Sequence, residues 1–215
     1  MKQYSVSRSF SRQVEVSDKA ASVMRMFGLS KDRLTEINVI CNCKLQINAG
    51  DIIYITGPSG SGKTVLLEEL GKFIPSGQKI NLKEIELPAG RAVIDCIDGE
   101  LLASLRLLST AGLNDVFCVL SEPANLSDGQ KYRFRLAMAI ASGKRFILAD
   151  EFCSELDRIT AAVISYNIHK FAKKAGVTFI LASSHEDILA DLLPDVLVTK
   201  ELSGPAEVIY RNGRM

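Results

Sequence analysis

The segment "GPSGSGKT" at residues 57–64 has the clearest chemistry in the sequence. It fits the pattern G-x-x-x-x-G-K-[ST], in which backbone N–H groups surround phosphates, the lysine reaches the β- and γ-phosphates and the hydroxyl ligates Mg²⁺. A chance match in a chain of this length is on the order of one in a hundred. The segment predicts a site for ATP and Mg²⁺ formed by Gly57, Pro58, Ser59, Gly60, Ser61, Gly62, Lys63, Thr64 and Val65.

Two carboxylates, Asp150 and Glu151, come directly after the apolar run "RFILA". At the carboxyl edge of a parallel sheet they would lie beside the phosphate loop. Asp150 is then a candidate ligand of Mg²⁺, and Glu151 is placed to polarise the water that attacks the γ-phosphate. The alternative, two solvated acids at a strand end, loses weight because a phosphate loop precedes them.

These side chains need a sheet to position them. Continuously apolar runs at 51–56, 91–97, 145–150 and 177–184 alternate with segments of helical period, which predicts a mostly parallel α/β sheet flanked by helices. Shorter β-type runs at 12–16, 37–40 and 43–47 predict an antiparallel N-terminal β region, and residues 195–213 read as a closing hairpin.

The stretch "LSDGQ" at 126–130 resembles the signature motif of the ABC-type ATPases, a family of P-loop NTPases. The similarity continues through the following helix, the Asp150–Glu151 pair and "SELD" at 154–157, in the family's order and close to its spacing. His185 falls where the family has its switch histidine. The resemblance implies a P-loop core with an antiparallel N-terminal β subdomain and a reduced helical signature subdomain.

The family's site is shared between two subunits. The resemblance implies that Ser127, Gly129 and Gln130 clamp the γ-phosphate of ATP bound on a second copy of the chain, so ATP would join two copies head to tail. Asp157 would lie along the dimer seam. His185 would hydrogen-bond the γ-phosphate and, with Glu151 and Lys63, form the catalytic set.

Three positions depart from the family or rest on weaker signals. Asp128 replaces a glycine of the signature, and its side chain is expected to point away from ATP. Asp95 lies in the predicted strand 91–97, at the position where the family has a glutamine. It could ligate Mg²⁺ or pair with a nearby base. Phe27 lies about where the family stacks an aromatic ring on adenine, although a core position would explain it equally simply.

Composition is that of a globular protein, with 47% apolar residues and a net charge of +1 in 215 residues. No apolar run is long enough to span a membrane, and five cysteines without a CxxC pair suit reduced thiols, so we expect a cytoplasmic location. We expect one domain, 1–215, with an antiparallel β subdomain at 1–50, the P-loop core at 51–95 and 130–215, and a short helical segment at 96–129.

The leading hypothesis is an ATPase whose ATP-dependent dimerisation drives a soluble partner or a nucleic-acid process in the cytoplasm. The missing glutamine and the short segment before Leu126 favour it. The alternative is the ATP-binding subunit of an ABC transporter that works with a separate membrane permease. A third reading, an ATP-binding switch without hydrolysis, is disfavoured by Glu151 and His185.

Overall fold

The computed structural model describes residues 2–8, 16–28, 41–202 and 204–211. Its strands are β1 (Lys2–Arg8), β2 (Cys41–Ile47), β3 (Ile52–Thr56), β4 (Lys79–Asn81), β5 (Phe146–Ala149), β6 (Thr178–Ala182), β7 (Val196–Thr199) and β8 (Glu207–Tyr210). Its α-helices are α1 (Asp18–Met26), α3 (Lys63–Lys72), α4 (Leu101–Thr110), α5 (Val116–Leu120), α6 (Asp128–Ala141), α7 (Arg158–Ala175) and α8 (Leu189–Leu192). Short 3₁₀ turns are η1 (Ser76–Gln78), η2 (Leu82–Glu84), η3 (Val93–Cys96) and η4 (Pro123–Asn125).

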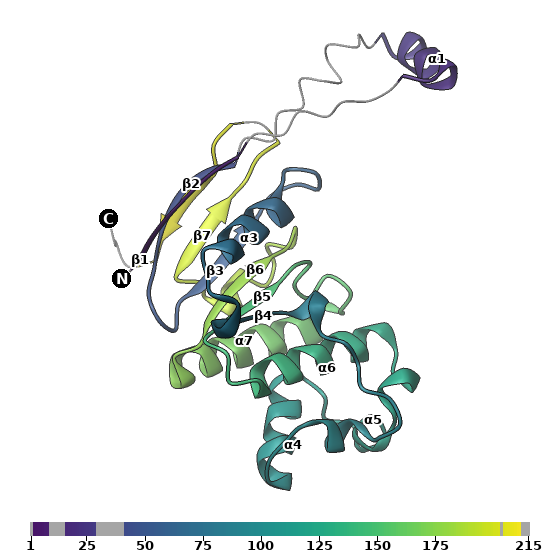
Figure 1. Cartoon of the computed structure of the whole chain (residues 1–215), viewed down its shortest axis with the longest axis vertical. Helices are drawn as coiled ribbons and strands as arrows, with labels where there is room; N and C mark the ends of the chain where they lie inside the picture. Colours follow the sequence, from purple (N-terminus) through teal and green to yellow (C-terminus); the bar gives the residue numbers. More distant parts are fainter. Residues whose placement is uncertain (1, 9–15, 29–40, 203, 212–215) are drawn as a thin grey trace.

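A six-stranded sheet forms the centre, in the order β4-β5-β6-β3-β7-β8 (Figure 1). Every neighbouring pair is parallel except β7 and β8, which pair antiparallel as the predicted closing hairpin. Because β3 lies in the middle of this sheet, the loop that follows it opens at the carboxyl edge beside the ends of β5 and β6. The predicted mostly parallel α/β sheet is confirmed.

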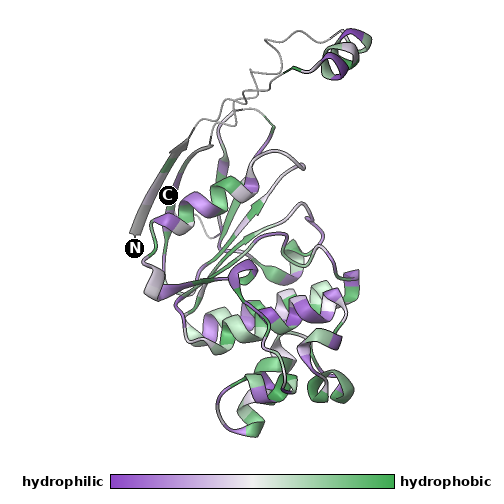
Figure 2. Ribbon diagram, turned by 45° about the vertical axis from the view of Figure 1, so that its right-hand side comes forward, coloured by the Kyte–Doolittle hydropathy of each residue, from purple (hydrophilic) through white to green (hydrophobic). Residues whose placement is uncertain are grey.

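The central sheet separates two apolar cores, and β3 contributes to both because its side chains alternate. Ile52 and Tyr54 face the core formed with α4, α6 and α7, whereas Ile53 and Ile55 face the core formed with α3 and the N-terminal strands. All four side chains are fully buried. Figure 2 shows the result as predominantly hydrophobic strands between helices that carry both hydrophobic and hydrophilic residues.

β1 and β2 form a separate antiparallel pair, with Val6 opposite Cys43 and Tyr4 opposite Leu45. The predicted antiparallel N-terminal region is therefore confirmed, and β1 is a strand that the sequence pattern did not identify. The predicted strand at 37–40, and all of that at 12–16 except Val16, lie outside the described residues. Between β1 and β2 the structure describes α1, which buries no residue.

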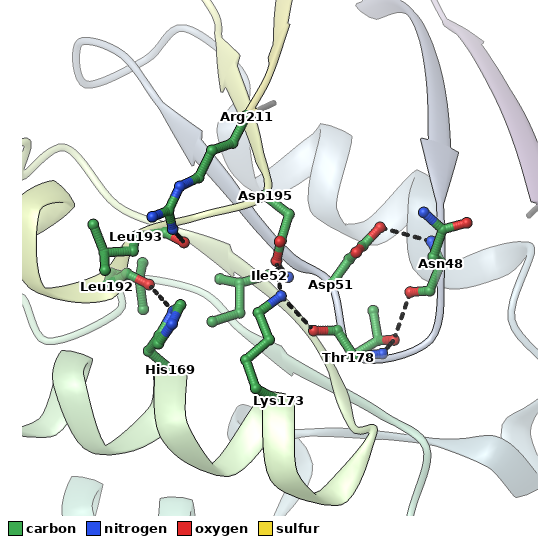
Figure 3. A network of polar contacts seen from close by, with 11 residues as sticks. Asn48, Asp51, Ile52, His169, Lys173, Thr178, Leu192, Leu193, Asp195 and Arg211 are labelled. Atoms are coloured by element: carbon green, nitrogen blue, oxygen red, sulfur yellow. Dashed lines mark hydrogen bonds and ion pairs between the residues drawn. The ribbon is translucent and has the colours of Figure 1, made fainter. Parts of the chain in front are cut away.

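The amino edge of the sheet is fixed by a polar network that is remote from the phosphate loop (Figure 3). The Asp195 carboxylate accepts hydrogen bonds from the Ile52 N–H at 2.8 Å and from Lys173 Nζ at 2.6 Å. Lys173 Nζ also donates to the Gly50 carbonyl at 3.1 Å. The network joins the end of α7 to the start of β3.

The prediction of a strand at 91–97 is wrong. Residues 93–96 form η3, with Val93 and Ile97 buried and Asp95 exposed. The Val93 N–H donates to the Ser121 carbonyl at 2.9 Å, so this segment is attached to the end of α5 and does not extend the sheet. The strand that follows the phosphate loop is β4, which pairs with β5 and has only three residues.

The segment between η3 and α6 contains two short helices, as predicted, here α4 and α5. It carries five large apolar side chains that are at least 59% exposed: Leu101, Leu102, Val116, Phe117 and Leu120. In the described part of the chain, no helix combines the length and apolarity that crossing a membrane requires.

Candidate functional site

The loop between β3 and α3 has a backbone that glycine permits. Gly57, Gly60 and Gly62 have φ angles of +142°, +82° and +95°, in the region that side chains disfavour. A Cβ on Gly57 would lie 2.0 Å from the Lys200 carbonyl oxygen. Residues 57–62 thereby turn tightly and place the N-terminus of α3, whose N-cap is Gly62, at the carboxyl edge of the sheet. That helix end favours an anion such as a phosphate.

A cavity of about 430 Å³ lies at this edge. Its walls come from three segments that are far apart in the sequence: the phosphate loop with the start of α3, the residues after β5, and the residues after β6. The lining residues are Ser59, Gly60, Gly62, Lys63, Thr64, Val65, Asp150, Glu151, Ser154, Ser183 and Ser184. The fold thus brings the phosphate loop and the two predicted carboxylates to one cavity.

The Lys63 ammonium points back across its own loop. Its Nζ donates to the carbonyls of Gly57 at 2.8 Å and Pro58 at 2.9 Å. Burial lowers the pKa of this lysine, while the nearby charges of Asp150 and Glu151 raise it. A cation held by carbonyl groups at the cavity wall can exchange those neutral partners for phosphate oxygens, which are stronger acceptors.

Asp150 and Glu151 follow β5, and Glu151 has an unusual backbone conformation. Its φ is +50°, which is uncommon for a residue with a side chain, and its N–H donates to Asp150 Oδ1 at 3.1 Å. The next residue, Phe152, is fully buried, and its N–H donates to the Ala182 carbonyl at 2.8 Å. The turn therefore holds the Glu151 side chain at the exposed cavity wall while β5 remains joined to β6.

His185 lies in the loop after β6, near this cavity but outside its lining. Its N–H donates to Ser183 Oγ at 3.3 Å, and its imidazole Nδ1 is 3.9 Å from Asp187 Oδ1. Nearly half of the side chain is exposed. Asp187 also forms an ion pair with Arg158, the first residue of α7.

The cavity residues fit a nucleotide whose Mg²⁺ is held partly by phosphates. Among the described residues there is no cluster of three or more His, Cys, Asp or Glu that could hold a metal by itself. Thr64 and Asp150 both line the cavity, and Mg²⁺ is commonly held by one or two protein oxygens together with phosphate oxygens. The hydroxyl of Ser61, buried in the same loop, has no hydrogen-bond partner among the described residues. Gly57, Pro58 and Ser61 belong to the loop but not to the lining.

The signature residues lie at the start of α6, outside the cavity. Ser127 Oγ accepts from the Gln130 N–H at 3.3 Å, and Gln130 Oε1 accepts from the Ser127 N–H at 2.9 Å. This reciprocal pair is a capping box. A Cβ on Gly129 would be 3.2 Å from Leu156, so the signature touches the "SELD" segment. Ser127 and Asp128 of the signature and Glu155 and Asp157 of "SELD" are exposed.

Two predicted residues are separate from this arrangement. Asp95 lines a different hollow, of about 350 Å³, with residues of η3 and the start of α4. Phe27 caps the C-terminus of α1 and is 74% exposed. The adenine-stacking role of Phe27 stays a prediction, and the metal role of Asp95 rested on a strand that the fold does not contain.

Four residues near the cavity were not singled out from the sequence. Ser154, Ser183 and Ser184 line it, and Ser154 Oγ is 3.3 Å from Ser183 Oγ. Lys83 follows β4, pairs with Glu68 at 2.5 Å, and has its pKa raised first by Glu68 and also by Asp150. Isolated serines and lysines carry no spacing signal. The strand that positions Lys83, β4, has only three residues and gave no recognisable pattern either.

No protein-family model matches the chain. Its curated relatives include the lipoprotein-releasing system ATP-binding protein LolD of Ehrlichia ruminantium, 27% identical over 208 aligned positions that cover 79% of this chain and 88% of that protein. Because 79% of 215 residues is about 170, LolD has residues in this alignment that the chain lacks. The methionine import ATP-binding protein MetN of Escherichia coli is 28% identical, over 84% of this chain and 62% of its own length.

Solved structures share the fold. A dimeric ATP-binding cassette in a post-hydrolysis state, bound to ADP and phosphate, has a TM-score of 0.69 at 18% identity, covering 99% of this chain and 100% of that one. A dimeric bacterial ABC transporter cassette has a TM-score of 0.65 at 20% identity, covering 82% of this chain and 92% of that one.

Proposed function

With the chain identified as an ABC-type ATPase domain, we propose that it is the ATP-binding subunit of a transport system, acting as an ATP-dependent homodimer on the cytoplasmic side of a membrane. The observation that carries the ATPase part is the cavity that contains the phosphate loop together with Asp150 and Glu151. These groups come from separate stretches of the chain, and phosphoryl transfer to water needs all of them within reach of one γ-phosphate.

In the proposed mechanism each residue has a separate task. The N–H groups at the start of α3 and the Lys63 ammonium would hold the phosphates, while Thr64 and Asp150 would hold Mg²⁺, which would neutralise phosphate charge. Glu151, exposed at the cavity wall, orients a water and accepts its proton. His185, in the adjacent loop, donates a hydrogen bond to the γ-phosphate.

We further propose that the second half of each site comes from another copy of the chain. The signature residues Ser127 and Gly129 lie outside the cavity on their own subunit, at the exposed N-terminus of α6, which favours a phosphate. Leu156 lies next to Gly129, and Asp157, which follows Leu156 in the chain, would form part of the same seam. The dimeric assemblies among the structural relatives support this arrangement.

The comparisons favour a transporter subunit over the soluble-partner or nucleic-acid hypothesis, because the curated relatives are ATP-binding proteins of lipoprotein-release and methionine-import systems. The surface of α4 and α5 adds a physical argument. Large apolar side chains that are exposed close together in sequence, on α4 and α5, are candidates for a protein interface. A membrane permease is the partner that we propose for that surface, which we call the α4–α5 patch: Leu101, Leu102, Val116, Phe117 and Leu120.

The test uses Glu151→Gln, which keeps the shape of the side chain but cannot accept the proton. Steady-state ATP hydrolysis should fall at least ~100-fold, the usual contribution of a general base. Size-exclusion chromatography should then reveal a dimer in ATP and Mg²⁺ but a monomer without nucleotide. Unchanged turnover in this variant would remove Glu151 from the mechanism.

Lys63→Ala is the matched control for nucleotide binding. Lys63→Ala should lose ATP binding, measured by isothermal titration. Combined with Glu151→Gln, it should also lose the ATP-dependent dimer. Retained affinity would show that ATP binds elsewhere on the chain.

A further inference from the structure

The hydroxyl of Tyr54 links the strand before the phosphate loop to the loop that carries His185. Tyr54 lies in the middle of β3, and its side chain is fully buried. Its hydroxyl donates to the backbone carbonyl of His185, 131 residues away in the sequence. The mechanism proposed for the ATPase site does not use this contact.

The His185 backbone is held on both sides. Tyr54 binds its carbonyl, and Ser183 Oγ accepts from its N–H at 3.3 Å. Ser183 is itself fixed, because its N–H donates to the Ile55 carbonyl at 3.0 Å. Both tethers therefore end on β3, one through a side chain and one through the backbone.

β3 runs directly into the phosphate loop, since Thr56 is its last residue and Gly57 follows. A displacement of His185 relative to β3 is thus a displacement relative to the bound phosphates. The imidazole is only loosely held by the described residues: it is nearly half exposed, and its polar neighbour Asp187 is 3.9 Å away. The backbone position decides where this side chain can reach.

We propose that Tyr54 is a positioning residue of the ATPase site, whose hydroxyl sets the His185 backbone at the distance from the phosphate loop that catalysis needs. The inference rests on the proposed function. Burial raises the pKa of the Tyr54 phenol above its ordinary value, so the hydroxyl keeps its proton and remains a donor throughout the pH range of an assay.

Tyr54→Phe removes only the hydroxyl. We expect kcat for ATP hydrolysis to fall about tenfold with KM changed less than about twofold, because misplacement of a catalytic group affects the transition state more than substrate binding. In a His185→Ala background, which keeps the backbone carbonyl, the same change should have no further effect on kcat.

Tyr210→Phe is the matched control. Its hydroxyl also binds the backbone, accepting from the Gln46 N–H at 2.9 Å, but at β8, away from the cavity. This variant should keep the wild-type kcat. An equal loss in Tyr54→Phe with and without His185, or a wild-type kcat in Tyr54→Phe, would overturn the proposal.

A second readout needs no turnover. The chain has two histidines, His169 and His185, so two imidazole signals are expected by NMR and His185→Ala assigns them. Tyr54→Phe should shift the His185 signal and leave that of His169, which contacts Leu192, in place. An unshifted His185 signal would overturn the proposal even if the wild-type chain hydrolyses no ATP, a result that would count against the proposed function alone.

If Tyr54→Phe does not fold, Ser183→Ala tests the other tether. The same proposal predicts a lower kcat that again depends on His185, and a loss that is independent of His185 would contradict it.

Discussion

At the scale of single residues, the site depends on backbone conformations that few side chains tolerate. Gly57 turns the chain at a φ of +142° with the Lys200 carbonyl against it, and Glu151 turns it again at +50°. Such strain is retained where the surrounding structure enforces it, and it concentrates at functional sites. Here it aims the phosphate loop and the Glu151 carboxylate at the same cavity.

Gly57→Ala should be much more damaging than Gly60→Ala. Both positions have positive φ, which costs an alanine about 1 kcal/mol. Only at Gly57 would the new methyl also clash with the backbone. We therefore expect the free energy of unfolding of the protein to fall by about 2–4 kcal/mol in Gly57→Ala, against about 1 kcal/mol in Gly60→Ala. Thermal and urea unfolding measure both, and equal losses at the two positions would contradict the close approach of the Lys200 carbonyl to Gly57.

At the scale of elements, helix ends supply the phosphate-binding surfaces. α3 presents its N-terminus to the cavity, and α6 presents its N-terminus on the surface next to the "SELD" segment. The two ends differ in how they are capped. α3 begins at Gly62 without a side-chain cap, whereas α6 is closed by the reciprocal bonds of Ser127 and Gln130. The Ser127 hydroxyl therefore has a structural role, as the cap of α6, in addition to the proposed contact with ATP.

Two substitutions separate these duties. Ser127→Ala removes the cap and should lower the free energy of unfolding by about 1 kcal/mol. Ser127→Asp keeps a capping acceptor, so the monomer should remain near wild-type stability, but its carboxylate would repel the γ-phosphate of the partner.

Chemical unfolding reports the first effect, and the ATP-dependent dimer of the Glu151→Gln protein reports the second. We expect Ser127→Asp to abolish that dimer. If the protein with both Ser127→Asp and Glu151→Gln dimerised as tightly as the protein with Glu151→Gln alone, Ser127 would be excluded from the shared site.

At the scale of the whole molecule, the proposed activities lie on different surfaces. The cavity occupies the carboxyl edge of the sheet, the polar network closes the amino edge, and the α4–α5 patch lies on the helical segment. A partner bound there could respond to dimer closure because α4 packs against α6, which begins at the signature.

Replacing Phe117 and Leu120 by serine should weaken membrane association without affecting basal ATP hydrolysis. These side chains are 79% and 65% exposed, so their loss removes apolar contact area and leaves the core intact. Recovery of the chain with the membrane fraction of its own cells measures the effect.

Ile209→Ser is the control, since Ile209 is also exposed but lies on β8. Equal recovery of the double variant and this control would argue against a permease at the α4–α5 patch.

The sequence by itself determined the phosphate loop, the carboxylate pair after β5, and the parallel α/β architecture. The first two features are local, because a loop of fixed spacing, or a run of apolar residues that ends in acids, can be identified from about ten consecutive residues. The order of the signature, the carboxylate pair and His185 along the chain indicated the family. Periodicity failed at 91–97, because an apolar run can be buried against a helix as well as in a sheet, and the three-residue β4 was too short to recognise.

Only the tertiary structure decided which residues are neighbours in space. The serines that line the cavity and the hydroxyl of Tyr54 acquire a role because β3, β5 and β6 are neighbours in the sheet, although β5 and β6 follow β3 by about 90 residues or more in sequence. The same packing leaves Asp95 outside the cavity and exposes the α4–α5 patch. The physical reason is that contacts between distant segments depend on strand order and on which face each side chain takes, and neither is encoded in local spacing.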